Sequence, residues 1–356
     1  MGDPTERVLS ARELNRAVLA RQLLLQRADL SVVDAVERIA GLQTQYAPSG
    51  YIGLWSRLAR FTRADLTGGL ERREVVQATL MRATIHVVSA RDYPLFAEGV
   101  RRARQGWWRS TARTRGLDGA DLDALAARVR LLLADGPLRR SALVAALEEA
   151  GFARGLWEAA GLHVDLVRVP PSGTWERRRA DLYGLAQGWL PAGAATEAEG
   201  LAHLVRRYLG GFGPAPLADI ANWAGVTVTT LRPVVEGLAL RRFRDQAGGE
   251  LLDVADGLLP DPDTPAPVRF LSTWDANLLV HVRRAQILPE PYRGRVFHVK
   301  NPHSTPTFLV DGAVAGAWRY ADGRVSLEPY GPLADAARDA LEREGAALAS
   351  FHEDRG

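Results

Sequence analysis

The sequence repeats one order of predicted elements, in which helices precede a two-stranded hairpin. In the third copy, helices are predicted over 197–208, 213–225 and 226–238, followed by strands over 240–245 and 250–254. Three helices followed by a hairpin is the order of a winged helix, a form of helix-turn-helix. Recurrence of this order predicts tandem winged-helix units and a mostly helical α+β fold.

The second copy has the same order. Apolar residues at helical spacing predict helices around 122–132, around 143–147 with Gly151 as its stop, and through 156–167. An arginine-rich wing over 176–186 follows the third of these helices.

The first copy is longer. Its first helix begins at the capping box Ser10–Glu13 and its second at the N-cap Ser31, and the second is expected to end near Gln43. A third helix is predicted around 50–58 and a hairpin over 75–89.

The last hundred residues differ in pattern. Alternating apolar residues over 295–330 predict antiparallel strands, with turns at 301–304, 311–312 and 321–323 and a closing helix over 332–353. The expected division is therefore three winged-helix units followed by a β-rich domain with a terminal helix, with boundaries at 8–115, 116–195, 196–260 and 261–356.

Composition excludes several kinds of chemistry. The 356 residues include no cysteine, which excludes disulfides, thiolate catalysis and the common structural zinc sites. The seven histidines are scattered, and no HExxH, Walker loop or GxGxxG occurs, so we expect neither a metal nor a cofactor. No apolar run is long enough for a membrane span, and the N-terminus lacks a signal peptide core, so a cytoplasmic protein is expected.

Basic side chains are almost all arginine and occur in clusters. The formal charge is +3, and Lys300 is the only lysine. Three clusters fall at similar places in the repeated units: Arg101, Arg102 and Arg104; Arg177, Arg178 and Arg179; and Arg241, Arg242 and Arg244. Arginine suits phosphate oxygens and base edges, so duplex DNA is the expected partner, although single clusters are often only solvated faces.

Two glutamines separated by one residue stand out in the stretch GLQTQYAPSG, residues 41–50. Pro48 disfavours helix at Ala47, so the segment is expected to be loop. In extended chain Gln43 and Gln45 would share one face, whereas on a helix they would not. They either act together at one site or are polar surface residues that finish a helix.

The chain resembles the winged-helix DNA glycosylases of the AlkZ and YcaQ family. The resemblance rests on these stretches, in this order: LNRAVLARQLLL, GLQTQYAP, GLWSRL, LMRATIHVVSARDY, VPPSGTWERR, YLGGFGPAPLADIANWAG and LVDGAVAGAWR. Gln43 and Gln45 match the glutamine pair that the AlkZ branch uses catalytically, with Thr44 where the family usually has an apolar residue. The resemblance implies a C-shaped molecule with a positively charged concave face for duplex DNA.

The resemblance also implies a β-hairpin in the DNA cleft, which we match to residues 298–308. Lys300, Asn301 and His303 on this hairpin are expected to contact DNA, although a polar hairpin tip is equally the ordinary surface pattern. Arg82 and His86 flank Thr84 at strand spacing on the first wing, so these side chains are expected on one face, where they either contact phosphate or form a structural polar face. Arg177, Arg178 and Arg179 are further DNA-contact candidates.

A glutamine pair suits only an activated leaving group. An amide cannot act as a general base at neutral pH, but it can orient water and contact a sugar. A purine alkylated at a ring nitrogen, such as N7 of guanine, is already cationic and leaves without protonation. The expected function is a monofunctional DNA glycosylase for cationic alkylated purines, including bulky adducts and interstrand crosslinks, in DNA repair or self-resistance to a DNA-alkylating natural product.

Two other functions stay open. A non-catalytic winged-helix DNA-binding regulator would use the same fold but usually adds a dimerisation or effector element. A protein that binds a small alkylating antibiotic would leave the glutamine pair without a purpose. The favoured hypothesis predicts a monomer in the cytoplasm, associated with the nucleoid when bound to DNA.

Overall fold

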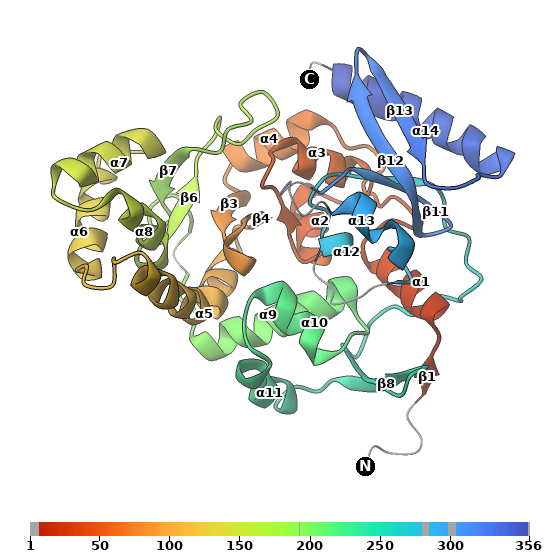
Figure 1. The fold of residues 1–356 in the computed structure, drawn as a ribbon, viewed down its shortest axis with the longest axis horizontal. Coiled ribbons are helices and arrows are strands. Elements are labelled where there is room, and N and C mark those ends of the chain that lie inside the picture. Colours follow the sequence, from red (N-terminus) through yellow and green to blue (C-terminus); the bar gives the residue numbers. More distant parts are fainter. Residues whose placement is uncertain (1–6, 192, 280–284, 298–303, 355–356) are drawn as a thin grey trace.

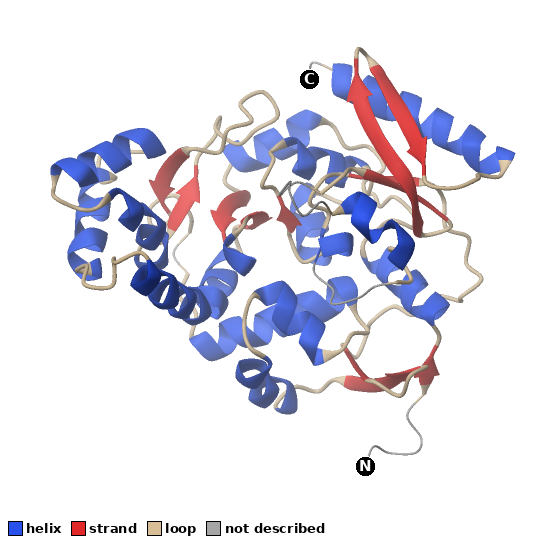
Figure 2. Ribbon diagram, viewed as in Figure 1, coloured by secondary structure: helices blue, strands red, loops and turns tan. Residues whose placement is uncertain are grey.

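The computed structural model describes residues 7–191, 193–279, 285–297 and 304–354. The fold is α+β with helices predominating (Figures 1 and 2). Figure 1 shows helices α6 to α8 at one end of the molecule and the C-terminal sheet with α14 at the other.

The N-terminal third holds five helices and three of the short strands among its described residues. They are α1 (Ala11–Arg21), α2 (Val32–Arg38), β2 (Leu42–Gln43), α3 (Pro48–Trp55), α4 (Arg63–Glu71), β3 (Val75–Thr79), β4 (Ile85–Ser89) and α5 (Tyr93–Thr114). The Ser10–Glu13 capping box and the β3–β4 hairpin confirm the sequence prediction. Helices α4 and α5 were not predicted.

Two details of the glutamine region were predicted wrongly. Helix α2 ends at Arg38, well before Gln43, because Ala40 and Gly41 take positive φ values of 64° and 79° and turn the chain into β2. Pro48 does not mark a loop but is the first residue of α3, where its missing N–H is not needed. Gln43 and Gln45 therefore lie between two helices.

The second and third copies contain the predicted helices, and the third contains the predicted hairpin. The elements are α6 (Leu122–Leu132), β5 (Leu138–Arg139), α7 (Arg140–Glu149), α8 (Trp157–His163), β6 (Leu166–Arg168), β7 (Leu182–Leu185), α9 (Glu197–Phe212), α10 (Leu217–Ala224), α11 (Val228–Glu236), β8 (Arg241–Asp245) and β9 (Glu250–Asp253). In the second copy the hairpin begins earlier than predicted, with β6 where helix was expected. Helix α8 stops at His163 because the apolar residues after it form β6. Pro233 lies inside α11, so one intrahelical hydrogen bond is missing.

The first two hairpins join into one sheet. Its strand order is β2-β4-β3-β6-β7-β5, and the junction is the antiparallel pairing of Gln77 with Arg168 and of Ala78 with Val167. Strands far apart in the sequence thus hold the two hairpins edge to edge, and the glutamine segment forms one border of this sheet.

Helix α5 follows the first hairpin and helix α9 begins the third copy, and the two helices cross in close backbone contact. A Cβ added at Gly99 would lie 2.7 Å from the Gly200 carbonyl carbon, and one at Gly200 would lie 2.4 Å from the Gly99 nitrogen. Only glycine at both positions allows this crossing. Apolar residues of both helices belong to the same buried core, including Phe96, Leu204 and Tyr208.

The third hairpin gains an unpredicted strand, because β1 (Val8–Leu9) pairs in parallel with β8. The C-terminal sheet has the order β10-β11-β12-β13 and is antiparallel. Its strands are Arg269–Leu271, Thr307–Val310, Ala313–Ala321 and Arg324–Pro329, with short helices α12 (Ala276–Leu279) and α13 (Arg293–Val296) between the first two and α14 (Asp335–Glu353) after the last. Strands β11 to β13 fall in the predicted range, whereas β10 was not predicted. The turns at 311–312 and 321–323 and the closing helix are confirmed. Strand was wrongly expected where α13 forms.

Candidate active site

Both glutamines meet the turn between β3 and β4. Strand β2 pairs antiparallel with β4, which sets Gln43 opposite His86. Arg82 Nη2 donates to Gln43 Oε1 at 2.6 Å, and the backbone N–H of Ile85 donates to Gln45 Oε1 at 3.2 Å. The structure therefore brings the two amides together at one hairpin turn, with Gln43 buried and Gln45 exposed.

The partners of the two amides fix their orientation. A guanidinium and a backbone N–H can only donate, so each amide must present its oxygen to them. Neither Nε2 group donates to another described residue. Each amide thus keeps its NH₂ group and the second lone pair of its oxygen for a ligand.

Thr44, between the glutamines, serves as an apolar residue. Its side chain is buried, and a Cβ added at Gly50 of α3 would lie 2.7 Å from the Thr44 methyl carbon. Its hydroxyl has no hydrogen-bond partner among the described residues. Packing against α3 thus places Thr44 inward.

Arg82 and His86 do not share a strand face as expected. Arg82 lies in the one-turn 3₁₀ helix η1 (Met81–Ala83) with φ +51°, and its Nη1 also donates to the Trp223 carbonyl at 2.5 Å. Burial lowers the pKa of Arg82 to about 10, so it stays charged at neutral pH. It anchors Gln43 and joins the first hairpin to α10.

His86 is not placed for a phosphate contact. It is 3% exposed, and its Nδ1 donates to the Thr84 carbonyl at 3.0 Å. Burial, reinforced by the Arg82 charge, lowers the pKa of His86 to about 3. His86 is therefore a neutral, buried side chain opposite Gln43, with a structural role and not the predicted DNA contact.

The buried His86 should make stability depend on pH. Between its ordinary pKa of 6.5 and the folded-state pKa of about 3, the unfolded chain binds a proton that the folded chain excludes. The free energy of unfolding should therefore fall by up to about 1.4 kcal/mol per pH unit as pH drops below 6.5. Urea unfolding of His86→Phe at pH 4.5 and 6.5 should show a shallower loss than the parent. An unchanged loss would contradict this assignment.

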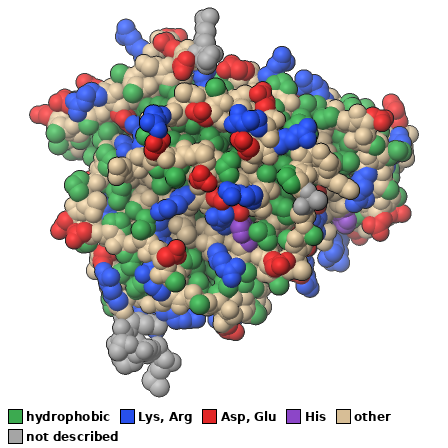
Figure 3. Space-filling model, turned by 180° about the vertical axis from the view of Figure 1, so that it is seen from behind, with side chains coloured by type: hydrophobic (Ala, Val, Ile, Leu, Met, Phe, Trp, Pro, Cys, Tyr) green, Lys and Arg blue, Asp and Glu red, His purple; other side chains and the backbone are tan. Residues whose placement is uncertain are grey.

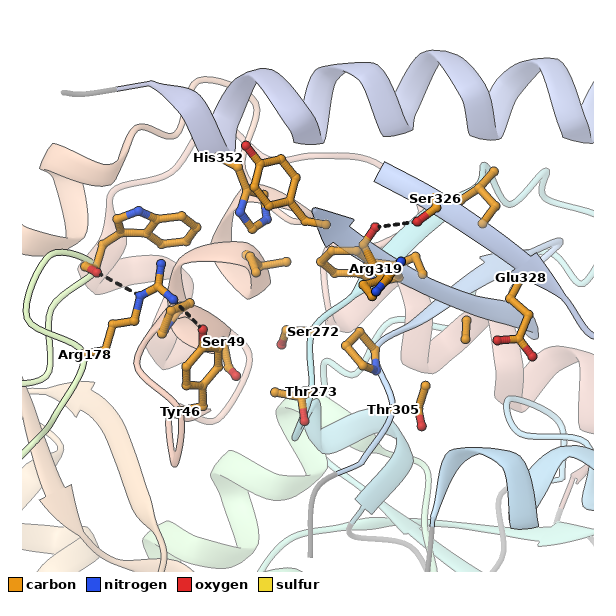
Figure 4. A pocket seen from close by; sticks show the side chains of 18 residues that line it. Tyr46, Ser49, Arg178, Ser272, Thr273, Thr305, Arg319, Ser326, Glu328 and His352 are labelled. Atoms are coloured by element: carbon orange, nitrogen blue, oxygen red, sulfur yellow. Dashed lines mark hydrogen bonds between the residues drawn. The ribbon is translucent and has the colours of Figure 1, made fainter. Parts of the chain in front are cut away.

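Arg178 brings the second wing to the glutamine segment. Its Nη1 donates to the Tyr46 hydroxyl at 2.9 Å, and its guanidinium lies 5.9 Å from the ring centroids of both Tyr46 and Trp175. Figure 4 shows Arg178 and Tyr46 side by side. Arg177 and Arg179 are exposed on the same loop, and Arg179 pairs with Asp181. Sequence reasoning missed Tyr46, although it directly follows Gln45.

Gln45 lines a cavity of about 530 Å³ that is rich in arginine. Arg104 donates to the Thr79 carbonyl at 2.8 Å, and Arg168 to the Thr79 hydroxyl at 3.0 Å. Burial lowers the pKa of Arg104 to about 10 and lowers that of Arg168. Among the described residues, no carboxylate forms an ion pair with Arg104 or Arg168. The carboxylate of Asp165, which also lines the cavity, pairs with Arg101.

The remaining predictions have mixed outcomes. In the third arginine cluster, Arg241 pairs with Asp253 and Arg242 with Glu250. Lys300, Asn301 and His303 lie outside the described residues, whereas the end of the predicted hairpin falls on β11.

The described residues offer neither a metal-ligand cluster nor a membrane-spanning helix. No group of three or more His, Asp or Glu side chains in these ranges could hold a metal ion. None of the helices in the described ranges is long and apolar enough to cross a membrane.

Comparison with known proteins defines the class as DNA glycosylase. A family model described as DNA glycosylase AlkZ-like matches residues 36–351. The chain therefore belongs to the AlkZ-like DNA glycosylase family.

A curated relative and a solved structure, both from Streptomyces sahachiroi, are similar to this chain. The interstrand DNA cross-link repair glycosylase is 23% identical over 359 residues, covering 93% of each chain. The solved structure of the DNA glycosylase AlkZ matches with a TM-score of 0.82 and 19% identity over 97% of each chain, so it shares the fold.

Proposed function

We propose that this chain is a monofunctional glycosylase that hydrolyses the N-glycosidic bond of cationic alkylated purines in duplex DNA. The observation that carries the proposal is the pair of anchored amides at the β3–β4 turn, beside an arginine-rich cavity. The name of the cross-link repair relative extends the proposed substrates to bulky adducts and interstrand crosslinks. The enzyme acts as a monomer, without metal or cofactor, on DNA in the cytoplasm.

The proposed mechanism needs no acid. The bond between C1′ and the purine breaks, its electrons neutralise the cationic base, and an oxocarbenium-like sugar develops. The free lone pairs of Gln43 and Gln45 orient a water toward C1′, and the new bond forms from the water oxygen while its proton leaves to solvent. Undamaged guanine is a poor leaving group for such a site, which gives selectivity.

We propose that DNA binds to arginines grouped around the β3–β4 turn. Arg82, Arg104 and Arg168 surround the hairpin turn and lack carboxylate partners among the described residues, so phosphate can supply the missing anion. On the face seen in Figure 3, basic and acidic side chains are interspersed, which gives that face no continuous positive field. Arg178 adds a cation from the second wing.

The three repeated sets are proposed to be the winged-helix units that shape a C-shaped DNA cleft, with the expected domain boundaries. Each set consists of a helix, a short strand or bridge residue, two helices and a hairpin, in this order. In each set the short strand or bridge residue pairs with the last strand of the hairpin: β2 with β4, β5 with β7, and Ala215 with Leu252 of β9. This shared pairing supports three units of one kind.

The proposed function is tested with a duplex that carries one N7-methylguanine. The purified chain should release the free base and leave the strand intact until heat or alkali is applied. Borohydride should trap no enzyme–DNA adduct, because water is the nucleophile and Lys300, the only lysine, forms no Schiff base. A trapped adduct that disappears in Lys300→Met would replace the water mechanism by a lyase, and binding without base release would favour the regulator.

A further inference from the structure

A second cavity adjoins the glutamine segment on the side of Tyr46. It encloses about 730 Å³ between the start of α3, the loop of the second wing and the C-terminal sheet (Figure 4). This volume lies within the range of about 300–1,000 Å³ typical of small-molecule sites. Tyr46 lines it, whereas Gln45 lines the other cavity, so the two cavities meet at neighbouring residues.

The walls of this cavity are aromatic and held in place. The ring of His352 stacks on Tyr320 with centroids 4.0 Å apart, and Trp175 meets His352 edge to face at 5.1 Å. Trp318 is fixed by a hydrogen bond from its Nε1 to the Leu271 carbonyl. Flat, immobilised rings on several sides suit a planar aromatic ligand.

Two buried polar atoms of residues that line this cavity lack hydrogen-bond partners among the described residues. Ser49 is 2% exposed, and its Oγ has no hydrogen-bond partner among the described residues; the same holds for the buried Nε2 of His352. Burial lowers the pKa of His352 to about 4, so its ring is neutral and can accept or donate. A buried polar group without a partner is unfavourable, so a turn of either side chain toward a hydrogen-bonding ligand in the cavity would be stabilising.

We propose that this cavity receives the appended alkyl group of the lesion, in the form of a planar aromatic ring that carries hydrogen-bonding oxygen or nitrogen atoms. The inference rests on the proposed function, because the purine must sit at Gln43 and Gln45. Since Gln45 does not line this cavity, the reacting base–sugar bond lies elsewhere, and the occupant is a part of the lesion beyond the base. Tyr46 and Arg178 line this cavity beside the glutamine segment, so we place the entry of the group there.

The test compares two duplexes with the same purified chain. One carries N7-methylguanine, and the other carries guanine alkylated at N7 by a (7-hydroxycoumarin-4-yl)methyl group, which is planar and bears hydroxyl and carbonyl oxygens. The readout is the ratio of kcat/KM for the coumarin duplex to that for the methyl duplex. Ser326→Trp fills the cavity from the exposed strand β13, and His352→Phe keeps the ring but removes its nitrogens. Ser350→Trp, at an exposed position on α14, is the matched control.

The ratio should fall about 10-fold or more in Ser326→Trp, the scale of steric exclusion from a substrate pocket. In His352→Phe it should fall about 3- to 10-fold, the scale of one lost hydrogen bond. Ser350→Trp should keep the parental ratio.

A parental ratio in both cavity variants, with methylguanine still released, would overturn this proposal alone. If the parent releases neither base, the proposed function and this inference fall together. Free 4-hydroxymethyl-7-hydroxycoumarin that binds tightly to the parent and not to Ser326→Trp, with unchanged excision ratios, would assign the cavity to free small molecules and also overturn the proposal.

Discussion

Alanine at Gln43 or at Gln45 should slow release of N7-methylguanine from duplex DNA by on the order of 10²-fold or more, the usual scale for a group acting directly on the reaction. Gln43→Ala removes an amide that Arg82 orients, and Gln45→Ala removes one that the Ile85 N–H orients. Single-turnover rates measure the loss, since product release does not contribute to them. Duplex binding should be nearly unchanged, because the proposed phosphate contacts are made by arginines and not by the glutamines.

A matched glutamine outside the site serves as control. Gln26 is exposed in the turn after α1, and Gln26→Ala should keep the parental rate. Full activity in the Gln43→Ala, Gln45→Ala double variant, with its circular dichroism and unfolding midpoint intact, would remove the glutamines from the mechanism.

Asp253→Ala should lower the free energy of unfolding by about 3–5 kcal/mol, the scale for breaking a buried ion pair. Arg21 and Asp253 are 1% and 0% exposed, with Nη1–Oδ1 at 2.6 Å and Nη2–Oδ2 at 3.0 Å. Arg241 also pairs with this carboxylate at 2.5 Å. Removal of the Asp253 carboxylate leaves the guanidinium groups of Arg21 and Arg241 without a counter-charge where α1 meets the third hairpin. Urea unfolding monitored by tryptophan fluorescence measures the change.

An exposed ion pair gives the comparison for this effect. Arg60 and Asp29 are 78% and 70% exposed, so Asp29→Ala should change stability by no more than about 1 kcal/mol. If both alanine variants unfold at the same urea concentration, burial does not set the strength of the Asp253 contact.

Local signals in the sequence predicted many of the elements. The Ser10–Glu13 capping box, the 246–249 hairpin turn and the Asp311–Gly312 turn each act through neighbouring residues, so their outcome is readable from a short window. The end of α2 was predicted wrongly because Ala40 adopts a positive φ that its residue type does not announce. The start of β6 was taken as helix, since its strand pairing with β3 depends on a distant segment.

In the candidate site, too, local features were predicted and contacts between distant segments were not. The glutamine pair was visible as a motif, whereas the strand at Gln43 and the bend at Gln45 were not predicted. Contacts of Tyr46 with Arg178 and of Gln43 with Arg82 join segments that are remote in sequence, so no local pattern predicts them. His86 matched the spacing of a surface residue but is buried by the neighbouring strands.

The joined sheet affects how this chain can fold during synthesis. Strand β3 pairs with β4 on one side and with β6 on the other, and β6 leaves the ribosome long after β3. Until then the first hairpin carries an open, largely apolar edge of the kind that pairs with other chains. The first hairpin is therefore incomplete until β6 is made, and β6 both closes this edge and holds the second hairpin beside the first.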